Sequence, residues 1–364
     1  MSKKPDEDDY SVGSDTEFED LELDPQTGQF SMGQDEFESV DLDSQASVES
    51  DIFGDPEPAA MLTADRLLEE KAREKNRPEG FWQKLIYLLS FGLINLGDSK
   101  KVRQRKELDA RIGASFGNQA KYVPVLTRKG GVGKTTVTTL IGMAMALVRE
   151  DRVVAIDANP DRGTLAERVK RGTSKTVRDV VSKASSITSF TAFSELVSRD
   201  QTRLDVLASD TDPMVSQAFD DGDYNVVADI TGRYYSLVLT DCGTGIVHSV
   251  MQAVLQRADG LVIVSGGSVD EARLASETLT WLEANGLGDI AKQSVVALNT
   301  ATFGTELVKL DEIEAHFRTR ARAVVRIPYD PKLAAGAEIV FEKLHPATRK
   351  AARELAALVA DGLA

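Results

Sequence analysis

The sequence RKGGVGKTT at residues 128–136 constrains the fold more than any other stretch of the chain. It follows an apolar, β-branched run at 121–127 and opens directly into an apolar helical pattern at 137–148. Glycines lack a Cβ, so successive backbone N–H groups can turn inward around phosphate oxygens while the positive end of the following helix faces them. Strand, glycine loop and helix in this order predict a phosphate-binding loop rather than a glycine-rich surface turn.

Two side chains that follow the glycines supply the chemistry that a bound nucleotide requires. Lys134 places a positive charge at the β- and γ-phosphates, and the hydroxyl group of Thr135 is in position to coordinate Mg²⁺. We therefore expect the loop to bind ATP together with Mg²⁺. The residues predicted to contact this cofactor are Gly130, Gly131, Val132, Gly133, Lys134, Thr135 and Thr136.

Strand and helix patterns alternate from about residue 120 to the end of the chain. This alternation predicts an α/β fold with a doubly wound, mostly parallel sheet that helices cover on both faces. Ligands of such folds bind at the carboxyl ends of the strands. Helical patterns cover 269–284 and 346–361, and the predicted strands are 121–127, 152–157, 204–208, 235–241, 260–265, 294–299 and 322–327.

Asp241 ends one of these strands and is followed by the glycine turn CGTG. A carboxylate that a buried strand fixes beside a phosphate loop is suited to hold Mg²⁺ through water. A strand-terminal aspartate also occurs without such a role, but the phosphate loop favours the metal site. The predicted metal residues are therefore Thr135 and Asp241.

The phosphate loop has Arg128 where the common pattern has glycine, and a second lysine, Lys129, precedes its glycines. The form K-G-G-x-G-K-T-T resembles the deviant Walker A motif of the MinD/ParA ATPases. The resemblance implies a P-loop NTPase fold. It also implies that Lys129 reaches across an ATP-dependent, nucleotide-sandwiched homodimer to the phosphates bound by the partner subunit.

One position departs from the family pattern D-x-D-P, in which the second aspartate orients the attacking water. The second strand ends at Asp157, and Asn159 occupies the second place. An amide oxygen can hydrogen-bond the water but does not bias it as a carboxylate does. The resemblance therefore implies slow ATP hydrolysis or a nucleotide-binding scaffold without hydrolysis. The candidate catalytic residues are Lys129, Lys134, Asp157 and Asn159.

Two further strand ends carry residues that the family uses at the adenine base. Asn299 ends one strand and the sequence IPYDP at 327–331 follows another, although Asn and Pro are also common as plain turn residues. The resemblance implies adenine contacts from Asn299, Pro328 and Asp330. Residues 80–364 are similar to the MinD/ParA-type ATPases associated with mycobacterial type VII (ESX) secretion. The segments that carry this similarity are INLG, DRVVAIDANP, LTDCGTG and IPYDPKLAAGAEI. The resemblance implies a role accessory to that secretion machinery.

Composition divides the chain into an acidic tail at 1–60, a helical linker at 61–119 and the ATPase domain at 120–364. The tail holds nineteen of the 58 Asp and Glu residues but two of the 43 Lys and Arg residues, so it accounts for the net charge of −15. Such a composition predicts disorder. A short acidic-hydrophobic repeat at 17–26 and 36–45 binds a protein partner bivalently, folds back onto a basic face of the ATPase domain, or only adds solubility.

The linker contains an apolar segment at 81–96, which precedes a basic cluster formed by Lys100, Lys101, Arg103, Arg105 and Lys106. This segment could lie on an anionic membrane, but packing against protein is the commoner fate of an apolar helix. The sole cysteine, Cys242, and the lack of an apolar run of about 18 residues favour a cytoplasmic location, with peripheral attachment to the inner face of the plasma membrane as the alternative.

Basic residues near the C-terminus allow a second function, in which the ATP-bound dimer binds DNA or membrane nonspecifically as a positioning protein. Solvated helix and strand ends are the plainer interpretation of the same residues. The residues concerned are His316, Arg318, Arg320, Arg322 and Arg326, and separately Arg349, Lys350 and Arg353.

Overall fold

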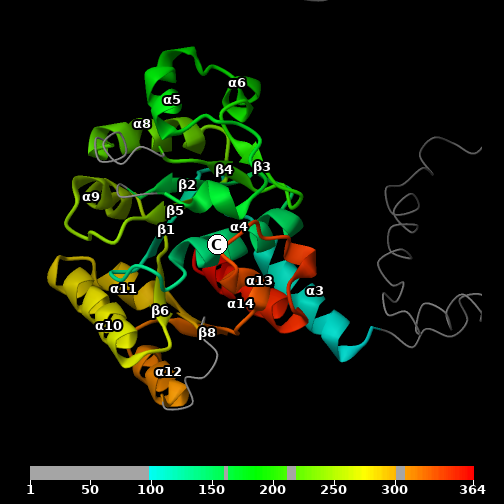
Figure 1. Cartoon of the computed structure of the whole chain (residues 1–364), viewed down its shortest axis with the longest axis vertical. Helices are drawn as coiled ribbons and strands as arrows, with labels where there is room; N and C mark the ends of the chain where they lie inside the picture. The colour runs from blue at the N-terminus through cyan, green and yellow to red at the C-terminus, as the bar shows by residue number, and fades with distance from the viewer. Residues whose placement is uncertain (1–97, 160–162, 211–218, 301–307) are drawn as a thin grey trace, which may run out of the picture. The chain divides into compact units, whose positions relative to one another are not determined.

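The structure, a computed structural model, describes residues 98–159, 163–210, 219–300 and 308–364. Its centre is an eight-stranded sheet with the order β3-β4-β2-β5-β1-β6-β7-β8 (Figure 1). Every neighbouring pair is parallel except β3 with β4. The strands are β1 (Lys121–Leu126), β2 (Val153–Ala158), β3 (Ser198–Arg199), β4 (Asp205–Leu207), β5 (Leu237–Cys242), β6 (Val262–Gly266), β7 (Val295–Asn299) and β8 (Ala323–Ile327).

The predicted mostly parallel, doubly wound α/β fold is therefore confirmed. The seven predicted strands are all present, and their ends differ from prediction by at most two residues. Their recognition has a physical reason, because parallel strands with helices on both faces are buried throughout and appear as continuous β-branched runs. All residues of β2, β5, β6 and β7 are buried. The antiparallel edge strand β3 was not predicted.

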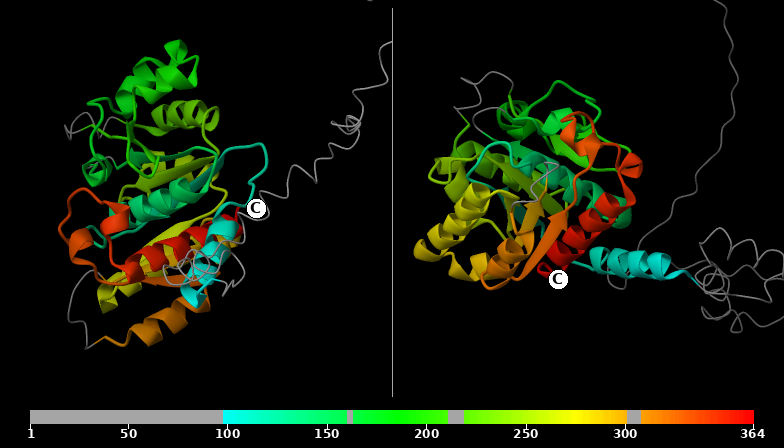
Figure 2. Two further views of the ribbon diagram at one scale, coloured as in Figure 1. Left: turned by 90° about the vertical axis from the view of Figure 1, so that its right-hand side faces the viewer. Right: turned by 60° about the horizontal axis from the view of Figure 1, so that its bottom comes forward.

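Helices cover both faces of the sheet (Figure 2). One face carries α4, α14 and α3, and the other carries α8, α9, α10 and α12. The predicted helices at 269–284 and 346–361 match α10 and α14. The helices are α3 (Lys100–Ile112), α4 (Lys134–Val148), α5 (Val177–Ser182), α6 (Phe190–Ser194), α8 (Asp221–Gly232), α9 (Ser249–Gln256), α10 (Val269–Ala284), α11 (Gly288–Gln293), α12 (Leu310–Arg318), α13 (Pro331–Ala334) and α14 (Pro346–Asp361), and the 3₁₀ turns are η2 (Leu165–Arg168), η3 (Ala184–Ser186) and η4 (Phe341–Lys343).

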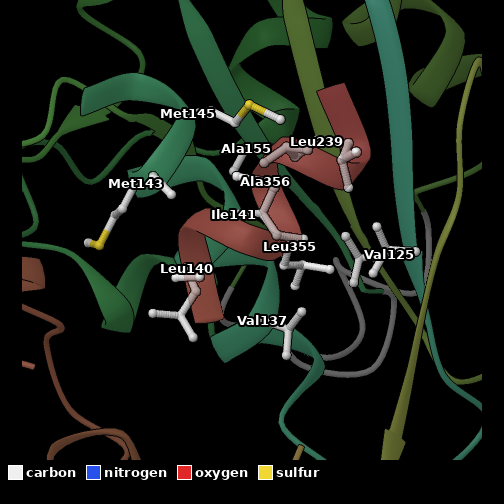
Figure 3. Packing of buried hydrophobic residues seen from close by; sticks show 14 of the residues in the cluster. Val125, Val137, Leu140, Ile141, Met143, Met145, Ala155, Leu239, Leu355 and Ala356 are labelled. Atoms are coloured by element: carbon white, nitrogen blue, oxygen red, sulfur yellow. The ribbon is translucent and has the colours of Figure 1, made fainter. Parts of the chain in front are cut away.

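The helix after the phosphate loop, α4, is buried on almost all sides, against the sheet and against α14. Ile141 of α4, Leu355 of α14 and the sheet side chains Val125 and Leu239 belong to one apolar cluster, and each of these four is fully buried (Figure 3). Full burial of a side chain of this size stabilises the fold by about 1.5–3 kcal/mol. This packing fixes the start of α4, and hence the phosphate loop, against the central strands.

Helix α3 begins at Lys100, the first residue of the predicted basic cluster, and packs along α14 (Figure 2). Arg111 pairs with Asp361 at 2.5 Å, and Arg353 pairs with Asp109 at 3.2 Å. The end of α3 is held by Arg149, whose Nη1 donates to the carbonyl of Ile112 at 2.7 Å. Part of the predicted linker is therefore a helix attached to the α/β fold.

The acidic tail, its repeat and the segment 81–96 lie outside the described residues, so their predicted roles remain predictions. Within the described part of the chain, no helix combines the length and the apolar character needed to cross a bilayer.

Candidate functional site

A cavity of about 370 Å³ opens at the carboxyl ends of the central strands, beside the loop between β1 and α4. The chain runs from β1 to β2 on one side of β1, and later crosses from β5 to β6 on its other side, so the direction of the strand order reverses at β1. Crevices at such switch points bind ligands in open α/β sheets. The cavity is lined by Thr127, Lys129, Gly130, Gly131, Gly133, Lys134, Thr135, Thr136, Asn159, Thr164, Arg168, Thr244, Asn299, Pro328, Tyr329, Asp330, Leu333, Ala334 and Gly336.

The glycine loop adopts a backbone that other residues rarely take. Gly131 and Gly133 have φ angles of 82° and 91°, in the left-handed region. A Cβ on Gly133 would lie 2.2 Å from Nδ2 of Asn299. That same Nδ2 donates a 2.8 Å hydrogen bond to the carbonyl of Val132. The glycine loop is thus held against the end of β7, and α4 begins at Lys134, directly after Gly133.

A carboxylate at the end of β5 joins the two side chains expected to meet phosphate and metal. Asp241 is fully buried and accepts a 2.6 Å bond from Nζ of Lys134. Its other oxygen accepts a 2.7 Å bond from the hydroxyl of Thr135. The hydroxyl of Thr138, one helical turn after Lys134, lies 3.2 Å from Asp241 Oδ1. A charge this deeply buried is tolerable because it is paired and hydrogen-bonded.

Asp157, at the end of β2, is a second buried carboxylate in the same region. Its oxygens accept backbone N–H groups from Leu165 at 3.0 Å and from Asn159 at 3.2 Å. Burial raises the pKa of Asp157 to about 7, and the charge of Asp241 adds to the increase while Lys134 opposes it. Asp157 therefore holds the backbone of Asn159 and Leu165 in place from behind the cavity wall.

Lys129 points toward α10 rather than into the phosphate loop. Its Nζ lies 3.6 Å from Oε1 of Glu271. Glu271 also closes a capping box with Ser268 at the start of α10. Burial acts to raise the pKa of Glu271, but bonds from Ser268 and the charge of Lys129 hold it below its ordinary value. Both side chains are partly exposed, so the ion pair contributes no more than about 1 kcal/mol to the stability of the fold. Lys129 can therefore leave Glu271 and pair with another anion.

The loop after β8 forms another part of the cavity wall. Pro328 and Tyr329 line the wall there, next to Asn299. Asp330 is almost fully buried, and its carboxylate accepts backbone N–H groups from Lys332 at 3.0 Å and from His345 at 2.8 Å. Asp330 thus holds the shape of this wall through its two carboxylate oxygens.

The structure brings most of the predicted site residues to one cavity. Val132, Asp157 and Asp241 lie behind its wall, and the other predicted residues line it. Sequence reasoning missed Thr138, whose position four residues after Lys134 places it on the same helical face. It also missed Thr164 and Arg168, which follow β2 in a segment without periodicity. The hydroxyl of Thr164 lies 3.4 Å from that of Thr135.

The basic residues proposed for DNA contact have partners of their own. Arg320 pairs with Glu283 at 2.8 Å, Arg326 pairs with Asp311 at 2.5 Å, and Arg318 pairs with Glu314. Arg349, Lys350 and Arg353 pair with Glu342, Glu354 and Asp109. Each pair neutralises charge, so these residues give little support to a phosphate-backbone surface.

The fold and the glycine loop define a nucleotide-binding protein of the P-loop class. The chain belongs to the family described as the CobQ/CobB/MinD/ParA nucleotide binding domain, which matches residues 123–338. The MinD/ParA relationship expected from the sequence is confirmed.

Individual relatives refine this placement. The chain is 34% identical over 283 residues to the ESX-1 secretion-associated protein EspI of Mycobacterium tuberculosis, covering 77% of this chain and 42% of that protein. It therefore spans less than half of that relative. The ParA family ATPase of Chlorobium tepidum superposes with a TM-score of 0.55 at 22% identity, covering 66% of this chain and 98% of that one. MinD of Pyrococcus horikoshii, solved with Mg-ADP, superposes with a TM-score of 0.52 at 18% identity, covering 65% of this chain and 94% of that one. These two structures support the fold.

Proposed function

We propose that this protein is an ATP-dependent switch, monomeric when free and homodimeric when ATP is bound. The observation that carries the proposal is the joining of Lys134, Thr135 and Asp241 at a left-handed glycine loop that borders a cavity. A lysine, a hydroxyl and a buried carboxylate at a helix start form the arrangement that holds nucleotide phosphates and their metal ion in P-loop proteins.

The donor atoms fit Mg²⁺ better than a transition metal. Thr135 and Asp241 offer two oxygens that lie 2.7 Å apart, and Mg²⁺ is commonly held by one or two protein oxygens together with phosphates and water. The described residues contain no group of three or more His, Cys, Asp and Glu side chains that could hold a metal alone. When bound there, Mg²⁺ would neutralise phosphate charge, and Lys134 would be the protein's own cation at the phosphates.

Two features support a dimer across this edge of the sheet. Lys129 is held by a weak, exchangeable pair with Glu271, so it can move to an incoming phosphate. Val247, after β5, and Val269, at the start of α10, are the large apolar side chains most exposed in the described chain, at 76% and 60%. Val247 comes three residues after Thr244, which lines the cavity, and Val269 comes two residues before Glu271, the partner of Lys129. A second subunit that binds at this edge would cover both side chains.

Dimerisation is tested by light scattering with ATP, with ADP and without nucleotide, at equal protein concentration. The proposal predicts a doubled mass with ATP and a monomer otherwise. Lys129→Ala is expected to remain monomeric with ATP. Its neighbour Arg128, paired with Glu277 at 3.6 Å, supplies the matched control Arg128→Ala, which should dimerise as the natural protein does. A natural protein that stays monomeric with ATP contradicts the switch.

Hydrolysis in the proposed cycle is slow because Asn159 lines the cavity where a carboxylate would better orient water. Single-turnover hydrolysis of Mg·ATP by the natural protein and by Asn159→Asp tests this. The rate should rise at least about tenfold in the variant if the amide limits the chemical step. Equal rates would mean that another group orients the water.

We further propose that the protein acts in the cytoplasm as an accessory of type VII secretion. The support is its similarity to EspI, which covers residues from both the ATPase fold and its N-terminal flank. The acidic tail and segment 81–96 are the proposed contacts for secretion partners. Deleting the gene in its host should reduce export of type VII substrates, and a Lys134→Gln copy should not restore it. Undiminished export would remove this role and leave the nucleotide switch intact.

A further inference from the structure

A third cation, besides the two lysines of the glycine loop, lines the cavity. Arg168 ends the η2 turn that follows β2, far in sequence from the phosphate loop and absent from its motif. Leu165 of the same turn is fully buried, and the carbonyl of Arg168 accepts a 2.8 Å bond from the N–H of Ile339. The backbone of Arg168 is thus fixed from two directions.

The guanidinium of Arg168 extends along the cavity wall formed by the segment after α13. Gly336 has a left-handed φ of 69°, and a Cβ there would lie 3.4 Å from Nη1 of Arg168. The guanidinium therefore lies beside the backbone of this segment. The neighbouring residues Thr164 and Thr135, whose hydroxyls lie 3.4 Å apart, join the same segment to the glycine loop.

Arg168 differs from the other two cations of the cavity in its bonding. Lys134 is paired with Asp241 and Lys129 with Glu271. In the described chain, Nε and Nη1 of Arg168 are buried and have no hydrogen-bond partner. Burial lowers the pKa of Arg168, while the charges of Glu167 and Asp241 oppose the decrease. A guanidinium nevertheless stays charged, so its unpaired N–H groups favour an anion.

We propose that Arg168 binds the phosphate groups of the nucleotide in this cavity. Arginine presents a planar set of donors that matches phosphate oxygens, and charge-assisted bonds of this kind are stronger than neutral ones. Thr164, at the start of the turn that Arg168 ends, lies 3.4 Å from the hydroxyl of Thr135, and that hydroxyl donates to Asp241. The η2 turn therefore lies on the side of the cavity where the phosphates and their metal ion are proposed to bind. This inference rests on the proposed nucleotide site and adds a ligand contact to it.

The free protein provides a second, independent expectation. Because Nε and Nη1 lack partners there, removing the side chain should not lower the stability of the nucleotide-free protein and could raise it. Arg168→Ala should therefore weaken binding without a loss of folding stability. A residue with a purely structural role would show the opposite pattern.

The test measures dissociation constants for Mg·ATP and Mg·ADP by calorimetry, with melting temperatures of the free proteins. Arg168→Ala should bind at least one of the nucleotides about tenfold or more weakly, which equals about 1.4 kcal/mol. Arg168→Lys keeps the charge and should recover part of the affinity. The matched control is Arg171→Ala, whose exposed side chain donates to the carbonyl of Thr173 at 3.0 Å and should bind as the natural protein does.

The outcomes separate this inference from the proposed function. If the natural protein binds and Arg168→Ala binds equally well, the role of Arg168 is wrong and the nucleotide site stands. A lower melting temperature for free Arg168→Ala that matches its weaker binding also overturns the inference. If the natural protein binds neither nucleotide, both proposals fail.

Discussion

Asp157 makes the stability of the nucleotide-free protein depend on pH in an unusual direction. Burial raises the pKa of its carboxyl group to about 7, from an ordinary value of 3.8. The folded protein therefore binds this proton more tightly than the unfolded chain. The resulting stabilisation is complete below about pH 4 and is lost as the pH rises through about 7. Asp157→Asn removes the titration and keeps a side chain of the same size.

The size of the effect follows from proton linkage. With pKa values of about 7 and 3.8 in the folded and unfolded states, the Asp157 contribution to the free energy of unfolding falls by about 2 kcal/mol between pH 5 and pH 7. Asp157→Asn weakens one of the two bonds from Leu165 and Asn159, but this loss is the same at every pH. The free energy of unfolding of Asp157→Asn, measured relative to that of the natural protein, should therefore rise by about 2 kcal/mol from pH 5 to pH 7.

Urea unfolding at pH 5, 6 and 7 in EDTA, without nucleotide, measures this difference. Asp330→Asn is the matched control, because Asp330 is also buried and accepts two backbone N–H groups. Burial acts to raise the pKa of Asp330, but those bonds hold it below its ordinary value, so its contribution is constant between pH 5 and pH 7. A difference between Asp157→Asn and the natural protein that does not change with pH would refute the reasoning.

Two further substitutions test the loop and the docking of α3, both by urea unfolding. Gly133→Ala should lower the free energy of unfolding by about 1–3 kcal/mol, because Gly133 has a left-handed φ and its Cβ would lie 2.2 Å from Asn299. The control Gly130→Ala, with nothing within 4 Å of its Cβ, should lower it by less than about 1 kcal/mol. Equal losses for the two variants would contradict the strain argument. Arg149→Ala should lower the free energy of unfolding by about 3 kcal/mol, because it leaves the carbonyls of Ile112 and Ala114 without this donor. The control Arg233→Ala, at an exposed position, should change the free energy of unfolding by less than about 0.5 kcal/mol.

The sequence was sufficient for the sheet and for the phosphate loop because both depend on local pattern. Buried parallel strands are apolar throughout, and the glycines of the loop occupy positions that need a left-handed backbone. Once the fold class was known, Asp157, Asp241 and Asn299 had to meet at one edge, because each ends a parallel strand.

Long-range contacts account for what the sequence could not reveal. Arg168 reaches the cavity because Ile339, far along the chain, holds its backbone. The pairing of Lys129 with Glu271 depends on how α10 packs against β6. Strand β3 has two residues, too few for any periodicity. The sequence predicted that α3 belongs to a helical linker, but it did not predict the contact of the end of α3 with Arg149, which follows α4.

The central claim is that the cavity binds ATP through the glycine loop, and calorimetric titration of Mg·ATP tests it most directly. The natural protein should bind one ATP per chain. Lys134→Gln keeps an N–H donor for Asp241 but removes the charge at the phosphates, so its affinity should fall at least about a hundredfold, or about 2.7 kcal/mol, with the fold intact by circular dichroism. Absence of binding by the natural protein, or equal binding by folded Lys134→Gln, would contradict the account.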